Sequence, residues 1–181
     1  MMWLRTAYIA VVLLVVTLVL LPLQLLGLAF NWHLRRRIPR IWHRIACHVL
    51  GIRVHVHGDL ERAKPLMLAV NHASWKDILV LGSIADVVFI AKTEVRDWPV
   101  FGWLARVQKS IFVQREQKRS TGAQVSEIAS RMADGEIVVL FPEGTTSDGN
   151  RVLPVKSSLF GAASTAADQV PGKRSEERRV G

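Results

Sequence analysis

The chain has 181 residues, half of them hydrophobic, a formal net charge of +9 and a single cysteine, Cys47. This length suits one domain with an attachment, and one cysteine excludes an internal disulfide framework and a cysteine-based zinc site. The positive charge predicts an anionic partner, such as anionic lipid, nucleic acid or a phosphate-bearing substrate. Cys47 is interpreted as a small buried hydrophobic residue without a reactive role.

The first predicted element is an apolar helix over residues 7–30, which only Thr17 and Gln24 interrupt. A helix of this length covers roughly 30 Å, which is the thickness of the hydrocarbon core of a bilayer. The run is too long for a cleaved signal peptide, and no clear small-residue cleavage site follows it. We therefore expect a membrane anchor, and the sequence leaves open whether it spans the bilayer or dips into it.

The second predicted element, over residues 31–52, is an amphipathic helix. It carries a stripe of apolar residues beside five arginines: Arg35, Arg36, Arg37, Arg40 and Arg44. Such a helix suits either the headgroup layer of a membrane or packing against its own domain. Because only Arg5 precedes the apolar run, the positive-inside rule predicts that the rest of the chain is cytoplasmic. The expected location is a bacterial inner membrane.

After the second helix the apolar period changes to that of an α/β domain. Ile52, Val54 and Val56 alternate with polar residues, which is typical of a strand. Further strands are predicted at residues 66–70, 87–91, 111–113 and 137–141, and helices at residues 77–84, 100–107 and 121–132. Strands that alternate with helices indicate a mostly parallel sheet flanked by helices.

Polar residues gather in three loops that follow predicted strands, at residues 71–76, 114–116 and 142–148. In parallel sheets, ligands bind at the carboxyl ends of the strands. His72, in the first loop, is a candidate base, and Asp77, at the start of the next helix, can fix its tautomer through a hydrogen bond. The non-catalytic alternative is that Asp77 only caps that helix and His72 is a hydrogen-bonded structural residue.

The other two loops contain candidates for binding an anion. Gly144 permits a turn whose backbone amides can point at an oxyanion or a phosphate. Arg115 and Lys92 each follow a predicted strand and can hold a phosphate, although a lone cation is more often a solvated surface residue. His55 and His57 lack further candidate ligands nearby, so no metal site is predicted.

These blocks together resemble the glycerolipid acyltransferase family, especially the 1-acyl-glycerol-3-phosphate acyltransferases. His72 and Asp77 match its His-x-x-x-x-Asp motif, Phe-Val-Gln-Arg ending at Arg115 matches its second block, and Phe-Pro-Glu-Gly-Thr-Thr-Ser, residues 141–147, matches its third. Lys92 fits a family position near the acceptor phosphate. The similarity covers roughly residues 66–161, and three blocks in order are far more specific than any one alone.

The resemblance implies an enzyme that moves a fatty acyl group from acyl-CoA or acyl carrier protein to a lysophospholipid. His72, oriented by Asp77, would be the base, and a backbone amide near Gly144 would stabilise the oxyanion. Lys92, Arg115, Glu143 and Thr145 would form the acceptor pocket. No cofactor, metal or nucleic acid is implied. The first choice of acceptor is 1-acyl-glycerol-3-phosphate, and the alternative is lyso-ornithine lipid, which close relatives acylate.

Two rival functions belong to other classes: a non-catalytic, membrane-tethered module that binds anionic lipid, and a hydrolase that uses the same histidine to activate water. The sequence also departs from the family, because the fourth block expected further along is missing. We therefore expect a C-terminally truncated fragment. Its expected parts are an anchor region at residues 1–52, an incomplete acyltransferase domain at 53–170, and a charged tail at 171–181 that is disordered or artefactual.

Overall fold

The computed structural model describes residues 2–61, 63–114, 121–147, 153–155 and 159–169. These residues form two compact units. The first comprises the described residues of Met1–Asp59 and Ser74–Val87, and the second those of Leu60–Ala73 and Val88–Gly181. Each unit is considered separately below.

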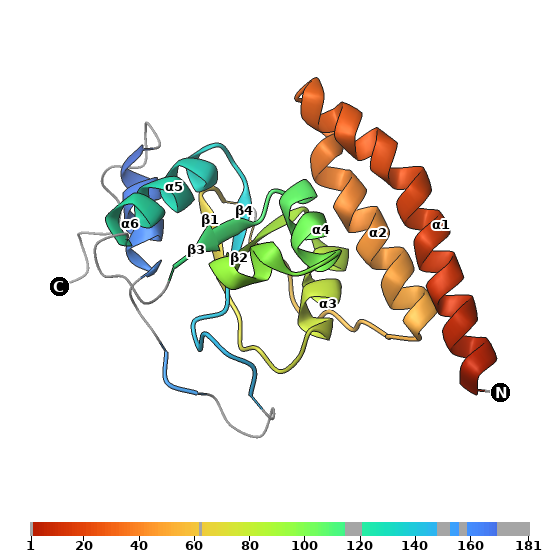
Figure 1. The fold of residues 1–181 in the computed structure, drawn as a ribbon. Coiled ribbons are helices and arrows are strands. Elements are labelled where there is room, and N and C mark those ends of the chain that lie inside the picture. The colour runs from red at the N-terminus through yellow and green to blue at the C-terminus, as the bar shows by residue number, and fades with distance from the viewer. Residues whose placement is uncertain (1, 62, 115–120, 148–152, 156–158, 170–181) are drawn as a thin grey trace. The chain divides into compact units, whose positions relative to one another are not determined.

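The first unit begins with a hairpin of two long helices, α1 (Met2–Ala29) and α2 (Leu34–Leu50), which lie side by side (Figure 1). Asn31 adopts a left-handed conformation with φ of 54°, which ends α1 and turns the chain. Midway along the hairpin, the Trp42 indole N–H donates to the Thr17 hydroxyl at 2.9 Å. The predicted apolar and amphipathic helices are thus both present, and they pack on each other.

Helix α2 also packs on α3 (Lys76–Ile84), through a buried cluster of Ala46, Cys47 and Leu79. Arg40 and Arg44 donate from their Nε atoms to the Ser83 carbonyl oxygen, at 3.4 and 3.0 Å. Two of the five arginines therefore complete the carboxyl end of α3, where a positive charge is favourable. The prediction that α2 packs against its own domain is confirmed.

The strand predicted from the alternation of Ile52, Val54 and Val56 is wrong, because this segment is irregular in the structure. Ile52 and Val54 instead pack against the buried α2–α3 cluster. An extended segment can place every second side chain on a neighbouring helix pair without a partner strand, so the same alternation arises without a sheet.

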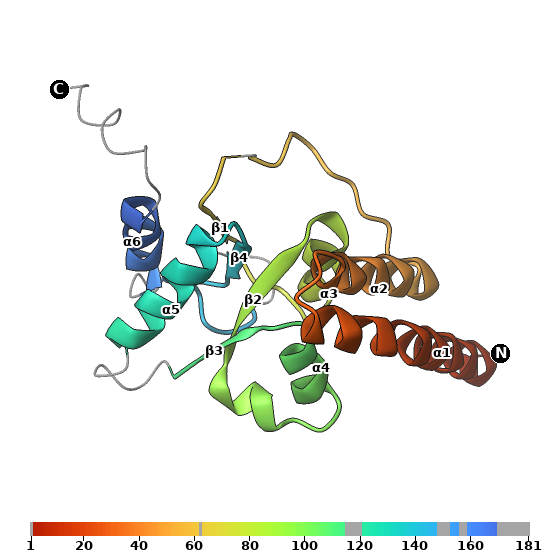
Figure 2. The same ribbon diagram turned by 90° about the horizontal axis from the view of Figure 1, so that it is seen from above.

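The second unit contains a four-stranded parallel sheet in the order β1-β4-β2-β3, visible in Figure 2. Its strands are β1 (Leu66–Ala69), β2 (Val87–Lys92), β3 (Ile111–Val113) and β4 (Ile137–Leu140). The pairing of β1 with β4 is in register from Leu66 opposite Ile137 to Ala69 opposite Leu140. The predicted α/β fold with a parallel sheet is confirmed.

Helices α5 (Thr121–Ala133) and α6 (Gly161–Gln169) pack on the sheet through one core. Ile128 and Met132 of α5 are fully buried there, and so are Ala162 and Ala166 of α6. Helix α5 ends at Ala133, and Gly135, with φ of 80°, turns the chain just beyond it as its N–H donates to the Met132 carbonyl oxygen.

Two elements were not predicted from the sequence. They are α6, whose small residues give a weak apolar stripe, and the short 3-10 helix η1 (Thr93–Asp97), which precedes α4 (Phe101–Val107). Residues 171–181, expected to form a charged tail, lie outside the described residues.

Candidate active site

His72 lies just past the carboxyl end of β1, where it contacts the loop that follows β4. The His72 imidazole stacks on the Phe141 ring with their centroids 4.1 Å apart and their planes 24° apart. The Ser147 N–H donates to the His72 carbonyl oxygen at 2.7 Å. Phe141 stacks in turn on Phe89, at 6.4 Å. His72 is therefore fixed by a backbone hydrogen bond and by an aromatic stack that continues into the buried part of the sheet.

The role of Phe141 was missed by sequence reasoning, which assigned this residue only to the end of a strand and to a motif. Phe141 is 6% exposed. An aromatic residue directly before a proline, at the end of an otherwise aliphatic strand, is the available signal for it. In a parallel sheet, the loops that follow neighbouring strands lie at the same edge. An aromatic ring at the end of one strand can therefore stack on a side chain from the loop after its neighbour.

The loop after β4 buries a carboxylate. Gly144 has φ of 74°, and its N–H donates to the Phe141 carbonyl oxygen at 3.1 Å, which closes a tight turn. Glu143 within this turn is 4% exposed. No described residue donates a hydrogen bond to either of its carboxylate oxygens. A buried charge without a donor is costly, and such a group marks a place where a bound cation or ligand completes the site.

The remaining predicted residues are distributed as follows. Lys92 is exposed at the carboxyl end of β2, opposite Val113 of β3, and so lies at the same edge of the sheet as His72. Thr145 is exposed next to the buried turn. Arg115 lies outside the described residues.

Asp77 lies in the first turn of α3, and its Oδ2 accepts a hydrogen bond from the Ser74 N–H at 2.8 Å. This is the capping contact that the non-catalytic alternative predicts. Asp77 belongs to the first compact unit and His72 to the second, and the hydrogen bond between their side chains stays a prediction.

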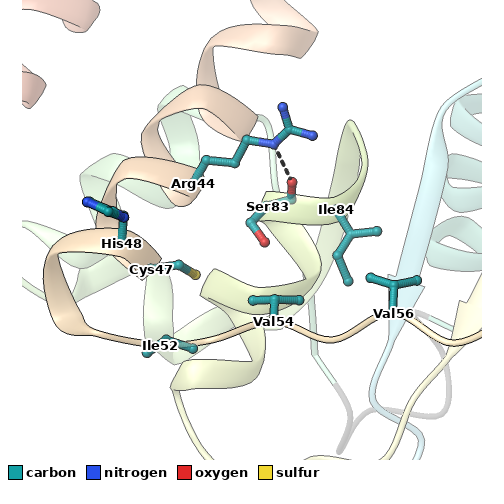
Figure 3. A pocket seen from close by; sticks show the side chains of 8 residues that line it. All are labelled: Arg44, Cys47, His48, Ile52, Val54, Val56, Ser83 and Ile84. Atoms are coloured by element: carbon teal, nitrogen blue, oxygen red, sulfur yellow. Dashed lines mark hydrogen bonds between the residues drawn. The ribbon is translucent and has the colours of Figure 1, made fainter.

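A pocket of about 370 Å³ lies in the first unit, and none of the predicted site residues lines it. In Figure 3 its walls come from α2, from the irregular segment after α2 and from the end of α3. Cys47 is buried in its wall, and this burial raises the pKa of the thiol above its usual value, partly offset by a hydrogen bond with Ser83. A thiol held protonated in this way is a poor nucleophile, which agrees with the structural role expected for Cys47.

The described geometry defines the class of site. Among the described residues, an imidazole, a buried carboxylate, a lysine and a glycine turn occupy the carboxyl edge of one parallel sheet. The profile of the Acyltransferase family matches residues 51–172. The chain belongs to this family.

Three comparisons are informative about the place of the chain within the family. It is 62% identical over 169 residues to a lyso-ornithine lipid O-acyltransferase of Rhizobium meliloti, covering 93% of this chain and 58% of the relative. It is 33% identical over 110 residues to a 1-acyl-sn-glycerol-3-phosphate acyltransferase of Neisseria gonorrhoeae, covering 61% and 43%. The crystal structure of PlsC, a 1-acyl-sn-glycerophosphate acyltransferase from Thermotoga maritima, has the same fold, with a TM-score of 0.65 at 24% identity over 91% of this chain and 70% of that one.

The chain thus spans between two fifths and three fifths of the length of these lyso-ornithine lipid O-acyltransferase relatives. The described site residues lie within residues 51–172, which the family profile matches.

Proposed function

We propose that the protein transfers a fatty acyl group from an acyl thioester to the free hydroxyl of lyso-ornithine lipid. The observation that carries this choice of acceptor is the 62% identity over 169 residues to a relative with that name. Relatives of the same name from three other organisms share 51, 40 and 34% identity, whereas relatives named for 1-acyl-sn-glycerol-3-phosphate share 33%. The acceptor first expected from the sequence therefore becomes the second candidate.

The proposed chemistry is a single acyl transfer at the carboxyl edge of the sheet. His72, oriented by Asp77, removes the proton of the lysolipid hydroxyl, and the oxygen attacks the thioester carbonyl carbon. The C–S bond then breaks, and the imidazolium returns the proton to the leaving thiolate. The ring stack on Phe141, at 4.1 Å, supports this role because it holds the imidazole in one orientation.

The oxyanion of the tetrahedral intermediate needs hydrogen-bond donors near the turn after β4. The Gly144 N–H already donates to Phe141 within that turn. We therefore assign the donor role to the backbone amide that follows, at Thr145, in keeping with the prediction of an amide near Gly144. Thr145 is exposed, as a group that meets substrate has to be.

The acceptor headgroup is assigned to Lys92, Arg115 and Glu143. Ornithine is an amino acid, so its headgroup offers a carboxylate where the other candidate offers a phosphate, and the two cations suit either anion. The buried Glu143 carboxylate organises the pocket. The acyl donor is acyl-CoA or acyl carrier protein, and no metal or covalent enzyme intermediate takes part in this scheme.

The test is an acyl-transfer assay on membranes that carry the full-length gene product. Lyso-ornithine lipid and lysophosphatidic acid are offered in parallel, each with both thioester donors. We expect ornithine lipid as the main product, and a loss of roughly 10²–10⁴-fold in rate for His72→Ala, the usual contribution of a general base. The matched control is His57→Ala, at an exposed histidine that no role is assigned to.

Each alternative has its own outcome in this assay. Phosphatidic acid as the main product would establish the second acceptor. Fatty acid released equally with and without acceptor would identify a hydrolase. Transfer that survives His72→Ala at the wild-type rate would refute the mechanism, and no product at all from a membrane-bound protein would favour a lipid-binding module.

A further inference from the structure

The second unit carries a cluster of large apolar side chains on its surface, at the end of η1 and the start of α4. Trp98 is 57% exposed, Val100 67%, Phe101 68% and Trp103 39%. We refer to these four residues as the aromatic knob. Scattered exposed apolar residues are ordinary, but four large ones within residues 98–103 mark a surface that meets a protein or a membrane.

The knob is held in place by the backbone. The Phe101 N–H donates to the Pro99 carbonyl oxygen at 2.7 Å, and the Gly102 and Leu104 N–H groups donate to Trp98 and Val100 at 2.9 Å each. Val100 adopts φ of 62°, a conformation that a β-branched residue rarely takes. The surrounding structure therefore imposes a definite shape on these exposed residues.

In helix α4 the small residue is buried and the large apolar residues are exposed, which is the reverse of an ordinary amphipathic helix. Gly102, its smallest residue, is buried against η1, so close that a Cβ there would lie 2.6 Å from the Val95 carbonyl oxygen. Its neighbours Phe101 and Trp103 are both exposed. A helix that only served the core of its own domain would bury the large residues and expose the glycine. The arrangement presents apolar surface outward.

The charges around the knob indicate what it meets. Residues 92–109 contain four basic residues, Lys92, Arg96, Arg106 and Lys109, and two acidic ones, Glu94 and Asp97. All six are exposed. Tryptophan and phenylalanine between cations are characteristic of a surface that enters the headgroup layer of an anionic bilayer, where the rings lie at the acyl boundary. Helix α1 is long and apolar enough to hold the chain at a bilayer.

We propose that the aromatic knob inserts into the headgroup–acyl boundary of an anionic membrane and is a second membrane contact, separate from the N-terminal helices. This contact belongs to the unit that contains His72, β1 and β4. It does not depend on the proposed choice of acceptor, because it concerns the bilayer and not the reaction.

Membrane binding of the whole chain cannot test this contact, since α1 would keep a variant bound. A local probe is needed, and the single cysteine makes one practical. In the full chain with Cys47→Ala, Phe101→Cys is labelled with an environment-sensitive fluorophore and reconstituted in vesicles with anionic phosphatidylglycerol. The matched control is the same label at Glu127→Cys, an exposed position on α5.

We expect the label at position 101 to shift its emission to the blue and to lose most of its fluorescence when the vesicles contain lipids with a nitroxide near the headgroup. The label at position 127 is expected to do neither. In vesicles of phosphatidylcholine alone, or with Arg96→Gln and Arg106→Gln together, the quenching at position 101 should fall.

Two outcomes overturn the proposal. A water-like spectrum at position 101 in every vesicle shows that the knob stays in solvent. A blue shift without quenching by lipid nitroxides shows that protein covers it, either a second copy or another part of this chain. A check without a label uses Trp98→Phe, which keeps the apolar surface. We expect brominated lipids to quench less of the total tryptophan fluorescence in this variant than in the wild type. An equal quenched amount in the two proteins would contradict insertion of Trp98.

Discussion

Glu143 is a buried carboxylate in the turn after β4, at 4% exposure, with no hydrogen-bond donor among the described residues. The effective desolvation penalty for such an ion is several kcal/mol unless a partner offsets it. Glu143 therefore stabilises the folded protein less than a neutral isostere would, unless a hydrogen-bond donor or a positive charge, from the acceptor or from the protein, reaches its carboxylate. In a site of this kind, the same group lowers the free energy of unfolding and strengthens the binding of the ligand.

We predict that Glu143→Gln leaves the unfolding midpoint of the acceptor-free protein unchanged or raises it, because the amide removes the buried charge. The same variant is expected to raise the KM for the acceptor. Thermal unfolding in detergent, with and without lyso-ornithine lipid, measures the first effect, and steady-state kinetics the second. A clear fall in the midpoint without acceptor would contradict the prediction, since it would show that the carboxylate already has a stabilising partner.

The candidate site was predictable from the sequence where polar residues directly follow a strand. His72, Glu143 and Gly144 were found in this way, because the carboxyl ends of parallel strands share one edge. The stack of Phe141 on His72 was not, since an aromatic residue in an apolar strand does not reveal which loop its ring will meet. The sequence predicted an oxyanion donor among the amides near Gly144 but could not say which one, and the Gly144 N–H itself closes its own turn.

At the scale of elements, the packing of α4 on η1 depends on one glycine. A Cβ at position 102 would meet the backbone of Val95 and Arg96, which cannot rotate away as a flexible side chain can. Gly122, in the first turn of α5, is the opposite case, because a Cβ there would have nothing within 4 Å. The two glycines form a matched pair for a test of this packing.

We predict that Gly102→Ala lowers the free energy of unfolding by about 1–3 kcal/mol, the usual cost of overpacking. Gly122→Ala should instead raise it, by up to about 1 kcal/mol, since alanine favours a helix over glycine. Denaturant unfolding of the two variants in the same detergent provides the comparison. Equal midpoints would mean that α4 moves off η1 at little cost.

The sequence correctly predicted β2, β3, β4 and α5, and these four elements have one property in common. They are buried by neighbours of the same sheet or core, so that apolar period and secondary structure agree, as in β4, whose last three residues are buried. The segment with Ile52 and Val54 has the period of a strand, but a helix pair is what buries it. Period shows which side chains are buried and not what buries them.

At the scale of the molecule, the first unit raises the question of how α1 meets the membrane. Its outer face exposes large apolar residues along its whole length, including Trp3 at 84% and Leu18 at 60%. Helix α2 runs antiparallel beside it: the ideal Cβ positions of Gly27 and Gly51 lie 3.2 Å from Arg35 and 3.6 Å from Arg5. The two helices are thus in contact at both ends of the hairpin.

This contact disfavours a spanning α1. If α1 crossed the bilayer with the hairpin intact, α2 would carry its arginines into the hydrocarbon, at about 2.5–3.5 kcal/mol for each one at the centre. If α1 lies in one leaflet, its apolar face meets the acyl chains while the arginines of α2 stay at the headgroups. Both ends of α1 are then on the cytoplasmic side that the arginines specify.

We predict that residue 3 is cytoplasmic. In the Cys47→Ala background, Trp3→Cys should resist a membrane-impermeant maleimide added to intact cells and react with it once the inner membrane is permeabilised. Glu127→Cys, on α5, should behave in the same way and reports the side of the second unit. Labelling of residue 3 alone in intact cells would show that α1 crosses the bilayer and the hairpin opens. Labelling of residue 127 would show that the orientation inferred from the arginines is wrong, because the positive-inside rule would then fail for this chain.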